Sequence, residues 1–381
     1  MITLQTSLLR RYIICRGVFR LLTGRRSLTN CNAGQIVCPN IMQSFTGIRC
    51  YSTTHIKLKA GDPSSSLLQE RYIVVLTSVG LWEDVPEGVL FDVGYLDSHP
   101  AGQYNPRQPT IVGIHDTPGT HGDLIDVLEP FAKLGYRVVI PNFPGFGSTR
   151  GSSASDETIF QHTLEERGQF LADFIANLGI PRIDLLVGLR SGCHLALWLS
   201  CAGREIFKAV ALISPSGHKQ TRAAGLSFLI KNIRNLWDYP FYRILLRGVA
   251  YIQKKNKDHK NLTVRDEISA FRCSGSVDYN EINAALLTLA GNNVARCIIY
   301  GKADPDDEIN LLEDYSSLLS VPASLFSEYD ENSKLIKSGD HSGNAWGVRF
   351  EKESLNLIHT EKSLLIKTLW DFLNHVKKTG S

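Results

Sequence analysis

Five short apolar runs, each bounded by turn-forming residues, most constrain the fold of this chain. They are "PTIVGIHD" (109–116), "YRVVIPNFPGFG" (136–147), "RIDLLVGL" (182–189), "KAVALISP" (208–215) and "ARCIIYGKAD" (295–304). Runs of this kind, without polar alternation, are typical of parallel strands that are buried on both faces. Helical patterns separate most of them. The alternation predicts an α/β fold with a mostly parallel central sheet and helices on both faces.

The flanking sequence extends this sheet. Residues 71–80 and 88–97 are expected to form neighbouring antiparallel strands, and residues 347–353 to form the last strand. Apolar periodicity predicts helices at 123–134, 157–178, 191–202, 308–319 and 360–376. Between 216 and about 293 the alternation stops, and helical, basic, aromatic-rich sequence follows. We interpret this part as a helical cap inserted at about 217–293 into one α/β domain spanning 70–378.

The amino-terminal segment differs in charge from the rest. The first 61 residues contain no Asp or Glu, and residues 1–51 carry seven arginines that interrupt an apolar stretch. A secretory signal or a membrane span would need an unbroken apolar core. The composition indicates a mitochondrial transit peptide (1–51) directing import to the matrix, cleaved between Tyr51 and Ser52 and followed by a linker (52–69). The alternative is a disordered basic tail with another role.

Charge and cysteine content exclude several function classes. Without its seven leader arginines the chain keeps 34 basic residues against 38 acidic ones, a net charge of −4, so no nucleic-acid partner is expected. Cys193, Cys201, Cys273 and Cys297 have neither CxxC spacing nor a matching histidine cluster, so we expect reduced, mostly buried thiols and no metal site. The glycine-containing stretches lack the spacing of a phosphate-binding loop, so no nucleotide, flavin or other cofactor is expected.

Three stretches together resemble the α/β-hydrolase family over nearly all of residues 70–378. "IHDTPGTHGDL" (114–124) resembles the family's HGxPG oxyanion loop, and "IPNFPGFGST" (140–149) its D.PGFGxS stretch. "VGLRSGCHLAL" (187–197) occupies the place of the nucleophile elbow and its helix. The combination is most similar to a branch of unknown function whose elbow usually reads GHSRGC.

The elbow spacing assigns the nucleophile position. A tight strand-to-helix turn needs small residues two before and two after its apex. Gly188 and Gly192 therefore place Arg190 at the apex. Ser191 as a shifted nucleophile would lose both small residues, and we expect it in the first helical turn instead. Cys193 lies near the helix start, and we expect a core thiol there.

The other catalytic members implied by the resemblance are also altered. A catalytic histidine is expected near Leu355, after the last strand, but none is present; His359 comes late and His341 precedes that strand. If "SKLIKS" (333–338) were the last strand instead, His341 would follow it. Asp304 matches the family's acid, although a loop aspartate that opens a helix explains it equally well.

The oxyanion loop also departs from the family, because its His-Gly pair is replaced by His115 and Asp116. A carboxylate there opposes a developing negative charge unless it turns away or pairs with Arg190. We expect His115 to bridge strand and loop.

Two binding hypotheses follow from these replacements. In the first, Arg190 anchors a small anionic ligand, because a guanidinium is permanently charged and suits carboxylate or phosphate. Arg190, Ser191, His115 and Asp116 are the candidate ligand-binding residues. The alternative is an internal salt bridge from Arg190 to Asp116 or Asp304 that fills the vacated space.

The second hypothesis concerns the cap. Residues 217–260 carry ten Lys and Arg against two Asp, with aromatic residues between them. Such a stretch suits an anionic membrane surface or an acidic protein partner, or it is a cap with a solvated basic face. The sequence predicts a binding or regulatory pseudoenzyme. The alternative is a weak esterase or acyl hydrolase using Ser191 with His341 or His359.

Overall fold

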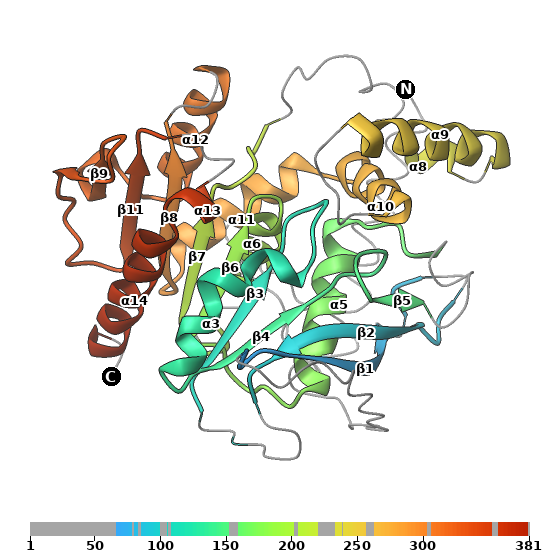
Figure 1. Ribbon diagram of the computed structural model, residues 1–381, viewed down its shortest axis with the longest axis horizontal. Coiled ribbons are helices and arrows are strands. Elements are labelled where there is room, and N and C mark those ends of the chain that lie inside the picture. Colours follow the sequence, from blue (N-terminus) through green and yellow to red (C-terminus); the bar gives the residue numbers. More distant parts are fainter. Residues whose placement is uncertain are drawn as a thin grey trace, which may run out of the picture. The chain divides into compact units, whose positions relative to one another are not determined.

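The computed structural model describes residues 66–379, except for 78–79, 83–84, 100–104, 106–107, 152–158, 202–204, 220–232, 238, 257–262, 303–305 and 353–356. The expected transit peptide, Asp304 and Leu355 lie outside the described residues. The described strands form one eleven-stranded sheet, in the order β1-β2-β4-β3-β6-β7-β8-β11-β9-β10, with β5 paired to β2 (Figure 1). The strands are β1 (Gln69–Thr77), β2 (Val89–Asp97), β3 (Thr110–Ile114), β4 (Arg137–Pro141), β5 (Arg150–Gly151), β6 (Leu185–Leu189), β7 (Ala209–Ile213), β8 (Ala295–Gly301), β9 (Phe326–Tyr329), β10 (Leu335–Lys337) and β11 (Ala345–Phe350).

The central strands confirm the predicted parallel core. β4, β3, β6, β7, β8 and β11 pair in parallel, and every residue of β3, β4, β6 and β7 is buried. Successive residues of a strand enter opposite hydrophobic clusters: Leu185 and Val187 lie in one, and Leu186 lies in the other. This follows from the two-residue period of a strand. It also explains why these runs are apolar without interruption, because both faces are covered.

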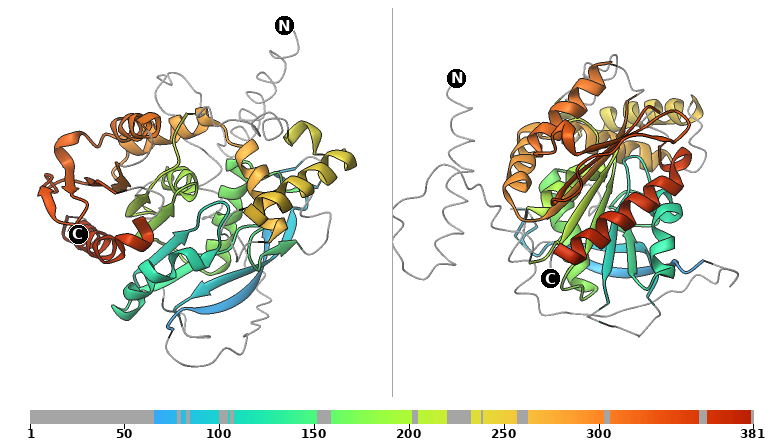
Figure 2. Two further views of the ribbon diagram at one scale, coloured as in Figure 1. Left: turned by 45° about the horizontal axis from the view of Figure 1, so that its top comes forward. Right: turned by 90° about the vertical axis from the view of Figure 1, so that its left-hand side faces the viewer.

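Helices cover both faces of the sheet, as Figures 1 and 2 show. The α-helices are α3 (Ile125–Lys133), α5 (Leu164–Asn177), α6 (Gly192–Ser200), α8 (Ile233–Leu236), α9 (Pro240–Asn256), α10 (Val264–Gly275), α11 (Tyr279–Gly291), α12 (Asp306–Leu318), α13 (Leu357–Thr360) and α14 (Lys362–Thr379). One cluster contains side chains of α3 and α14, and the other contains side chains of α5, α6 and α11. Helices α8 to α11 stand between β7 and β8, where the cap was expected. No helix in the described part of the chain is long and apolar enough to span a bilayer.

The helix expected from residue 157 begins later, with α5 at Leu164. Thr163 caps it: its side chain accepts a hydrogen bond from the backbone N–H of Glu166, and Glu166 accepts one from the backbone N–H of Thr163. This reciprocal arrangement fixes a helix start. His162 has a left-handed φ of 62°, which separates α5 from the chain before it.

The last strand was predicted at the right place, although its bounds differ. β11 begins two residues before the predicted 347–353 and ends at Phe350, and it pairs in parallel with β8 and also with β9. The competing stretch "SKLIKS" does form a strand, β10, but it pairs only with β9, in an antiparallel register at the edge of the sheet. The alternative that made it the last strand of the parallel series is therefore wrong. Strand β9 was not expected from the sequence, and β10 was expected only in that alternative.

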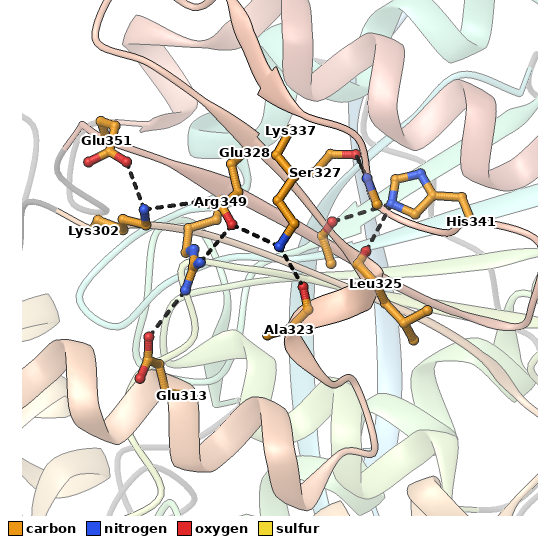
Figure 3. Close-up of polar contacts among 12 residues, drawn as sticks. Lys302, Glu313, Ala323, Leu325, Ser327, Glu328, Lys337, His341, Arg349 and Glu351 are labelled. Atoms are coloured by element: carbon orange, nitrogen blue, oxygen red, sulfur yellow. Dashed lines mark hydrogen bonds and ion pairs between the residues drawn. The ribbon is translucent and has the colours of Figure 1, made fainter.

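An ion-pair network fastens these edge strands to the core sheet (Figure 3). Glu328 on β9 pairs with Lys302 at 3.1 Å, with Arg349 of β11 at 2.9 Å and with Lys337 of β10 at 3.3 Å. Burial opposes the ionisation of Glu328, but the hydrogen bonds from Lys302 and Arg349 outweigh it and lower its pKa to about 2. Glu328 therefore holds three strands together as a carboxylate.

We expect Glu328→Gln to lower the free energy of unfolding by about 3 kcal/mol at neutral pH. The folded pKa of Glu328, about 2, lies below its ordinary value of 4.5, so the carboxylate stabilises the fold above pH 4.5. That contribution is lost as the pH falls toward 2, and the two proteins should converge there. Urea denaturation across this pH range measures the difference.

Glu313→Gln is the matched control. Glu313 contacts the same Arg349 at 3.1 Å, but its side chain is 54% exposed. We expect it to cost less than about 1 kcal/mol, because exposed ion pairs contribute little. Equal losses for the two variants would contradict the role given to Glu328.

Candidate functional site at the strand-to-helix elbow

The turn between β6 and α6 has the geometry of a nucleophile elbow, and Arg190 stands at its apex. Arg190 has a φ of 49°, in the left-handed region that is strained for residues other than glycine. A Cβ on Gly192 would lie 2.6 Å from the carbonyl oxygens of Ile114 and His115, and one on Gly188 would lie 2.8 Å from the Cα of Cys193. Both glycines are therefore sterically required. The elbow register predicted from their spacing is the one found.

Ser191 lies one residue after the apex, as expected. Its φ of −66° and ψ of −24° are helical, and it is the residue immediately before α6. Its hydroxyl donates to Asp116 Oδ1 at 2.8 Å. Ser191 therefore belongs to the start of the helix, and its hydroxyl is engaged by a carboxylate.

The side chain of Asp116 occupies the position where an α/β hydrolase would hold its oxyanion. Oδ1 accepts from the backbone N–H of Thr117 at 2.6 Å and from that of Ser191 at 3.1 Å. Oδ2 pairs with Arg190 Nε at 2.9 Å. An oxyanion hole is built from two such amide donors, one after the nucleophile and one from the loop after β3. Here the protein's own carboxylate receives both of them.

His115, one of the candidate ligand-binding residues, has structural contacts and is not among the described residues that line the elbow pocket. Its ring is fully buried between Phe143 and Phe146. Nδ1 lies 2.5 Å from the carbonyl oxygen of Asp116, and Nε2 accepts from the backbone N–H of Phe143 at 3.3 Å. Burial lowers the pKa of His115 to about 3, so the ring is neutral. It bridges the loops after β3 and β4, whereas the sequence led us to expect a bridge between strand and loop.

The two histidines considered as catalytic bases do not reach the elbow. His341 precedes β11, so it lies where the parallel strands begin, whereas Arg190 lies where they end. Its Nε2 lies 3.1 Å from the carbonyl oxygen of Leu325 (Figure 3). Its ring also stacks on that of Trp346. His359 follows the last strand but is exposed on α13 and is not among the described residues that line the elbow pocket.

A pocket of about 290 Å³ opens beside Arg190, at the carboxyl edge of the strands and under the cap. Ligand sites of open α/β sheets lie at this edge. Its walls carry three basic side chains, several hydroxyl groups and no carboxylate among the described residues. The lining residues include Thr117, Arg167, Arg190, Ser191, His194, Ser214, Ser216, Lys219, Cys273 and Ser274.

Arg167 of α5 is the pocket residue that sequence reasoning missed. Only 5% of it is exposed, and its guanidinium lies over the ring of Phe143 at 5.2 Å. Nη2 donates to Thr117 Oγ1 at 3.3 Å, and Nε has no hydrogen-bond partner among the described residues. None of those residues supplies a carboxylate to pair with it. Its position among Leu164, Leu171 and Phe174, on the apolar face of the helix, is the signal that could have identified it.

His194 is a second pocket residue that the sequence did not single out. It lies in α6, whose residues are all buried, and its Nε2 is 2.9 Å from the carbonyl oxygen of Ser216. Burial lowers the pKa of His194 to about 4. A neutral ring that donates from Nε2 holds the loop after β7 against the elbow.

The cysteines in the described part of the chain are free thiols, as expected. Cys193 is fully buried, and its Sγ lies 3.2 Å from the carbonyl oxygen of Gly188. Burial raises its pKa well above the ordinary value, so the prediction of a core thiol is confirmed. No group of histidine, cysteine or acidic residues suited to a metal ion occurs among the described residues.

We expect Asp116→Ala to lower the free energy of unfolding by about 2 kcal/mol, because it removes the acceptor of two amide donors and the partner of Arg190. Asp116→Asn should cost less, since its Oδ1 still accepts from both amides. Chemical denaturation of the wild type and the two variants measures the order of their stabilities. An alanine variant as stable as the wild type would contradict this account of the Asp116 contacts.

Comparison with known proteins agrees with this fold. The model of a family of α/β hydrolases of unknown function (DUF1057) matches residues 83–371. No curated protein matches the sequence.

Solved structures share the fold at low sequence identity. A carboxylesterase of Nitrososphaera gargenis has a TM-score of 0.52 at 14% identity, over 76% of this chain and 96% of the esterase. A haloalkane dehalogenase variant of Bradyrhizobium elkanii has a TM-score of 0.54 at 11% identity, over 82% of this chain and 98% of the dehalogenase. An esterase of Exiguobacterium antarcticum has a TM-score of 0.50 at 13% identity, over 79% of this chain and 98% of the esterase. At these identities the likeness concerns the fold alone, whereas the family model covers most of the chain. The protein belongs to this family of α/β hydrolases.

Proposed function

We propose that this chain is a pseudoenzyme of the α/β-hydrolase fold, imported into mitochondria, which binds a small anion in its elbow pocket and lacks serine-hydrolase activity. The observation that carries the proposal is the pairing of Asp116 with Arg190 at the elbow. Asp116 takes the amide donors of Thr117 and Ser191, and Arg190 stands at the apex.

The loss of hydrolysis follows from the chemistry of these side chains. A guanidinium stays protonated and cannot attack a carbonyl carbon. The Ser191 hydroxyl donates to the carboxylate of Asp116, and it makes no hydrogen bond with a histidine among the described residues. A substrate oxyanion would also have to displace Asp116 from the two amide donors. Each of these changes affects a group whose loss costs a serine hydrolase several orders of magnitude in rate.

Anion binding is supported mainly by Arg167. A buried charge without a counter-ion is costly, and buried charges in proteins are normally paired. A carboxylate or phosphate in the pocket would supply the missing partner. Arg190 lines the same pocket and pairs with Asp116 through Nε, one of the five N–H donors of its guanidinium. Lys219 adds a third positive charge, although Asp314 already contacts it at 2.7 Å.

The alternative function is a weak esterase or acyl hydrolase that uses Ser191 with His341 or His359. The helical backbone of Ser191 and the distant location of His341 disfavour it. An internal Arg190–Asp116 salt bridge, the alternative to ligand binding, is present beside the pocket. It does not account for Arg167, and for this reason we favour a ligand.

We expect the purified protein to stay unlabelled by a fluorophosphonate probe, in parallel with an active serine hydrolase that is labelled. Gel fluorescence measures the adduct. Labelling of the wild type that disappears in Ser191→Ala would establish a working hydrolase and refute the proposed loss of activity.

We expect inorganic phosphate, acetate or succinate to raise the thermal stability of the protein at constant ionic strength. A ligand that binds only the folded state adds about 2.7 kcal/mol at a hundred times its Kd. Arg167→Met should abolish the shift. Arg182→Met, which changes an exposed arginine between α5 and β6, should retain it. If none of the three anions shifts the wild type, or if Arg167→Met responds as the wild type does, anion binding through Arg167 is refuted.

The mitochondrial part of the proposal rests on the acid-free, arginine-rich segment 1–51. We expect the protein recovered from isolated mitochondria to begin at Ser52. Amino-terminal sequencing tests this, and recovery of the intact chain from the cytosol would contradict it.

A further inference from the structure

Helix α9 of the cap carries apolar side chains on two faces. Its inner face contributes Tyr242, Leu246 and Ala250 to a small core shared with Ile233 and Phe271. The opposite face exposes a second row of apolar side chains. These are Phe241, Ile244, Leu245 and Ile252, with exposed fractions of 78%, 64%, 42% and 58%. Figure 1 shows α9 beside α8 and α10, at the end of the cap far from α14.

The exposed row follows the helical period. Positions 244, 245, 248 and 252 follow position 241 by three, four, seven and eleven residues, so all five share one face of the helix, with Gly248 at its middle. A helix on a protein surface normally turns polar residues to solvent. A contiguous exposed apolar row of this kind marks an interaction surface. Tyr239 and Tyr251, both strongly exposed, flank it.

The charged residues of helix α9 all have one sign. The sequence of α9, "PFYRILLRGVAYIQKKN", contains four basic residues and no acidic one. A cavity of about 670 Å³ lies beside α9 and α10, and its described lining contains four arginines and no carboxylate. They are Arg243 and Arg247 of α9 and Arg265 and Arg272 of α10. Arg243 and Arg272 also contact the ring of Trp237. This arrangement is complementary to the phosphates of lipid headgroups.

We propose that α9 docks the protein on the surface of an anionic phospholipid bilayer. The row formed by Phe241, Ile244, Leu245 and Ile252 enters the boundary between headgroups and acyl chains, and Arg243 and Arg247 contact lipid phosphates. An apolar row with basic residues and no acid on the same helix is the pattern of an interfacial helix. Tyrosines at its edges suit the same depth, because one end of their ring is polar. This inference does not depend on what the elbow pocket binds.

The experiment follows insertion at single positions in the full-length protein. Phe241→Trp places a fluorophore on the proposed face, and Leu287→Trp places one on the exposed surface of α11, where Leu287 is 58% exposed. Both proteins are mixed with phosphatidylcholine vesicles containing cardiolipin and brominated acyl chains. We expect strong quenching of the emission added by Phe241→Trp and little quenching of that added by Leu287→Trp. Equal quenching at the two positions would overturn the proposal, even if another segment holds the protein on the vesicle.

Co-sedimentation with the same vesicles, without bromine, measures the contribution to affinity. We expect the Phe241→Ser, Ile244→Ser double variant to bind at least about tenfold more weakly than the wild type, given the apolar area removed. Leu287→Ser should bind as the wild type does. Binding should weaken at high salt and on vesicles of phosphatidylcholine alone. No binding of the wild type at low salt would overturn the proposal. The proposal would also be overturned if the protein formed a dimer through Phe241 and Ile244 and did not bind the vesicles.

Discussion

The close approach of α6 to the ends of β3 and β6 is the constraint on which the rest of the site depends. Gly192 packs against the carbonyl oxygens of Ile114 and His115, and Gly188 packs against the backbone of Cys193. This contact brings the loop after β3 next to the elbow and forces Arg190 into a left-handed backbone that costs about 1 kcal/mol or more. Helix α6 is buried along its whole length, so its packing holds the elbow whatever residue stands at the apex. The geometry therefore does not require a nucleophile at its apex.

In an active α/β hydrolase, the amide donors at this position stabilise a negative charge that forms on the substrate only during the reaction. Here the carboxylate of Asp116, paired with Arg190, places a negative charge there permanently. The amides of Thr117 and Ser191 converge on one oxygen of Asp116, so both donors are satisfied in the resting state. The negative charge placed there is balanced by Arg190 through the other oxygen. Either side chain alone would leave a partly buried charge beside the elbow without its partner. The two departures from the family's pattern are therefore one coupled change, and neither needs to be explained separately.

The sequence predicted the parts of the structure that depend on local spacing. The glycines at 188 and 192 fixed the elbow register, and uninterrupted apolar runs identified the parallel strands, because both signals lie within a few residues. The edge strand β9 was not predicted, and β10 was considered only as an alternative last strand, since short, partly exposed strands have little apolar pattern. Arg167 was missed for another reason. Its meaning depends on Phe143 and Thr117, which are distant in sequence and reach it only through the fold. The exposed face of α9 can likewise be identified only when Tyr242 and Leu246 are known to point inward.

The two basic regions differ in how much water surrounds them, and this difference sets what each can bind. Arg167 is almost entirely buried, so an anion that pairs with it does so in a medium of low effective dielectric and is little affected by salt. Arg247 on α9 is exposed, and an interaction of that charge with a surface is screened at physiological ionic strength. A single small anion suits the first region, whereas the second needs many weak contacts at once. A charged surface with an apolar layer beneath it, such as a bilayer, supplies those contacts through Phe241 and Ile244 together with the arginines.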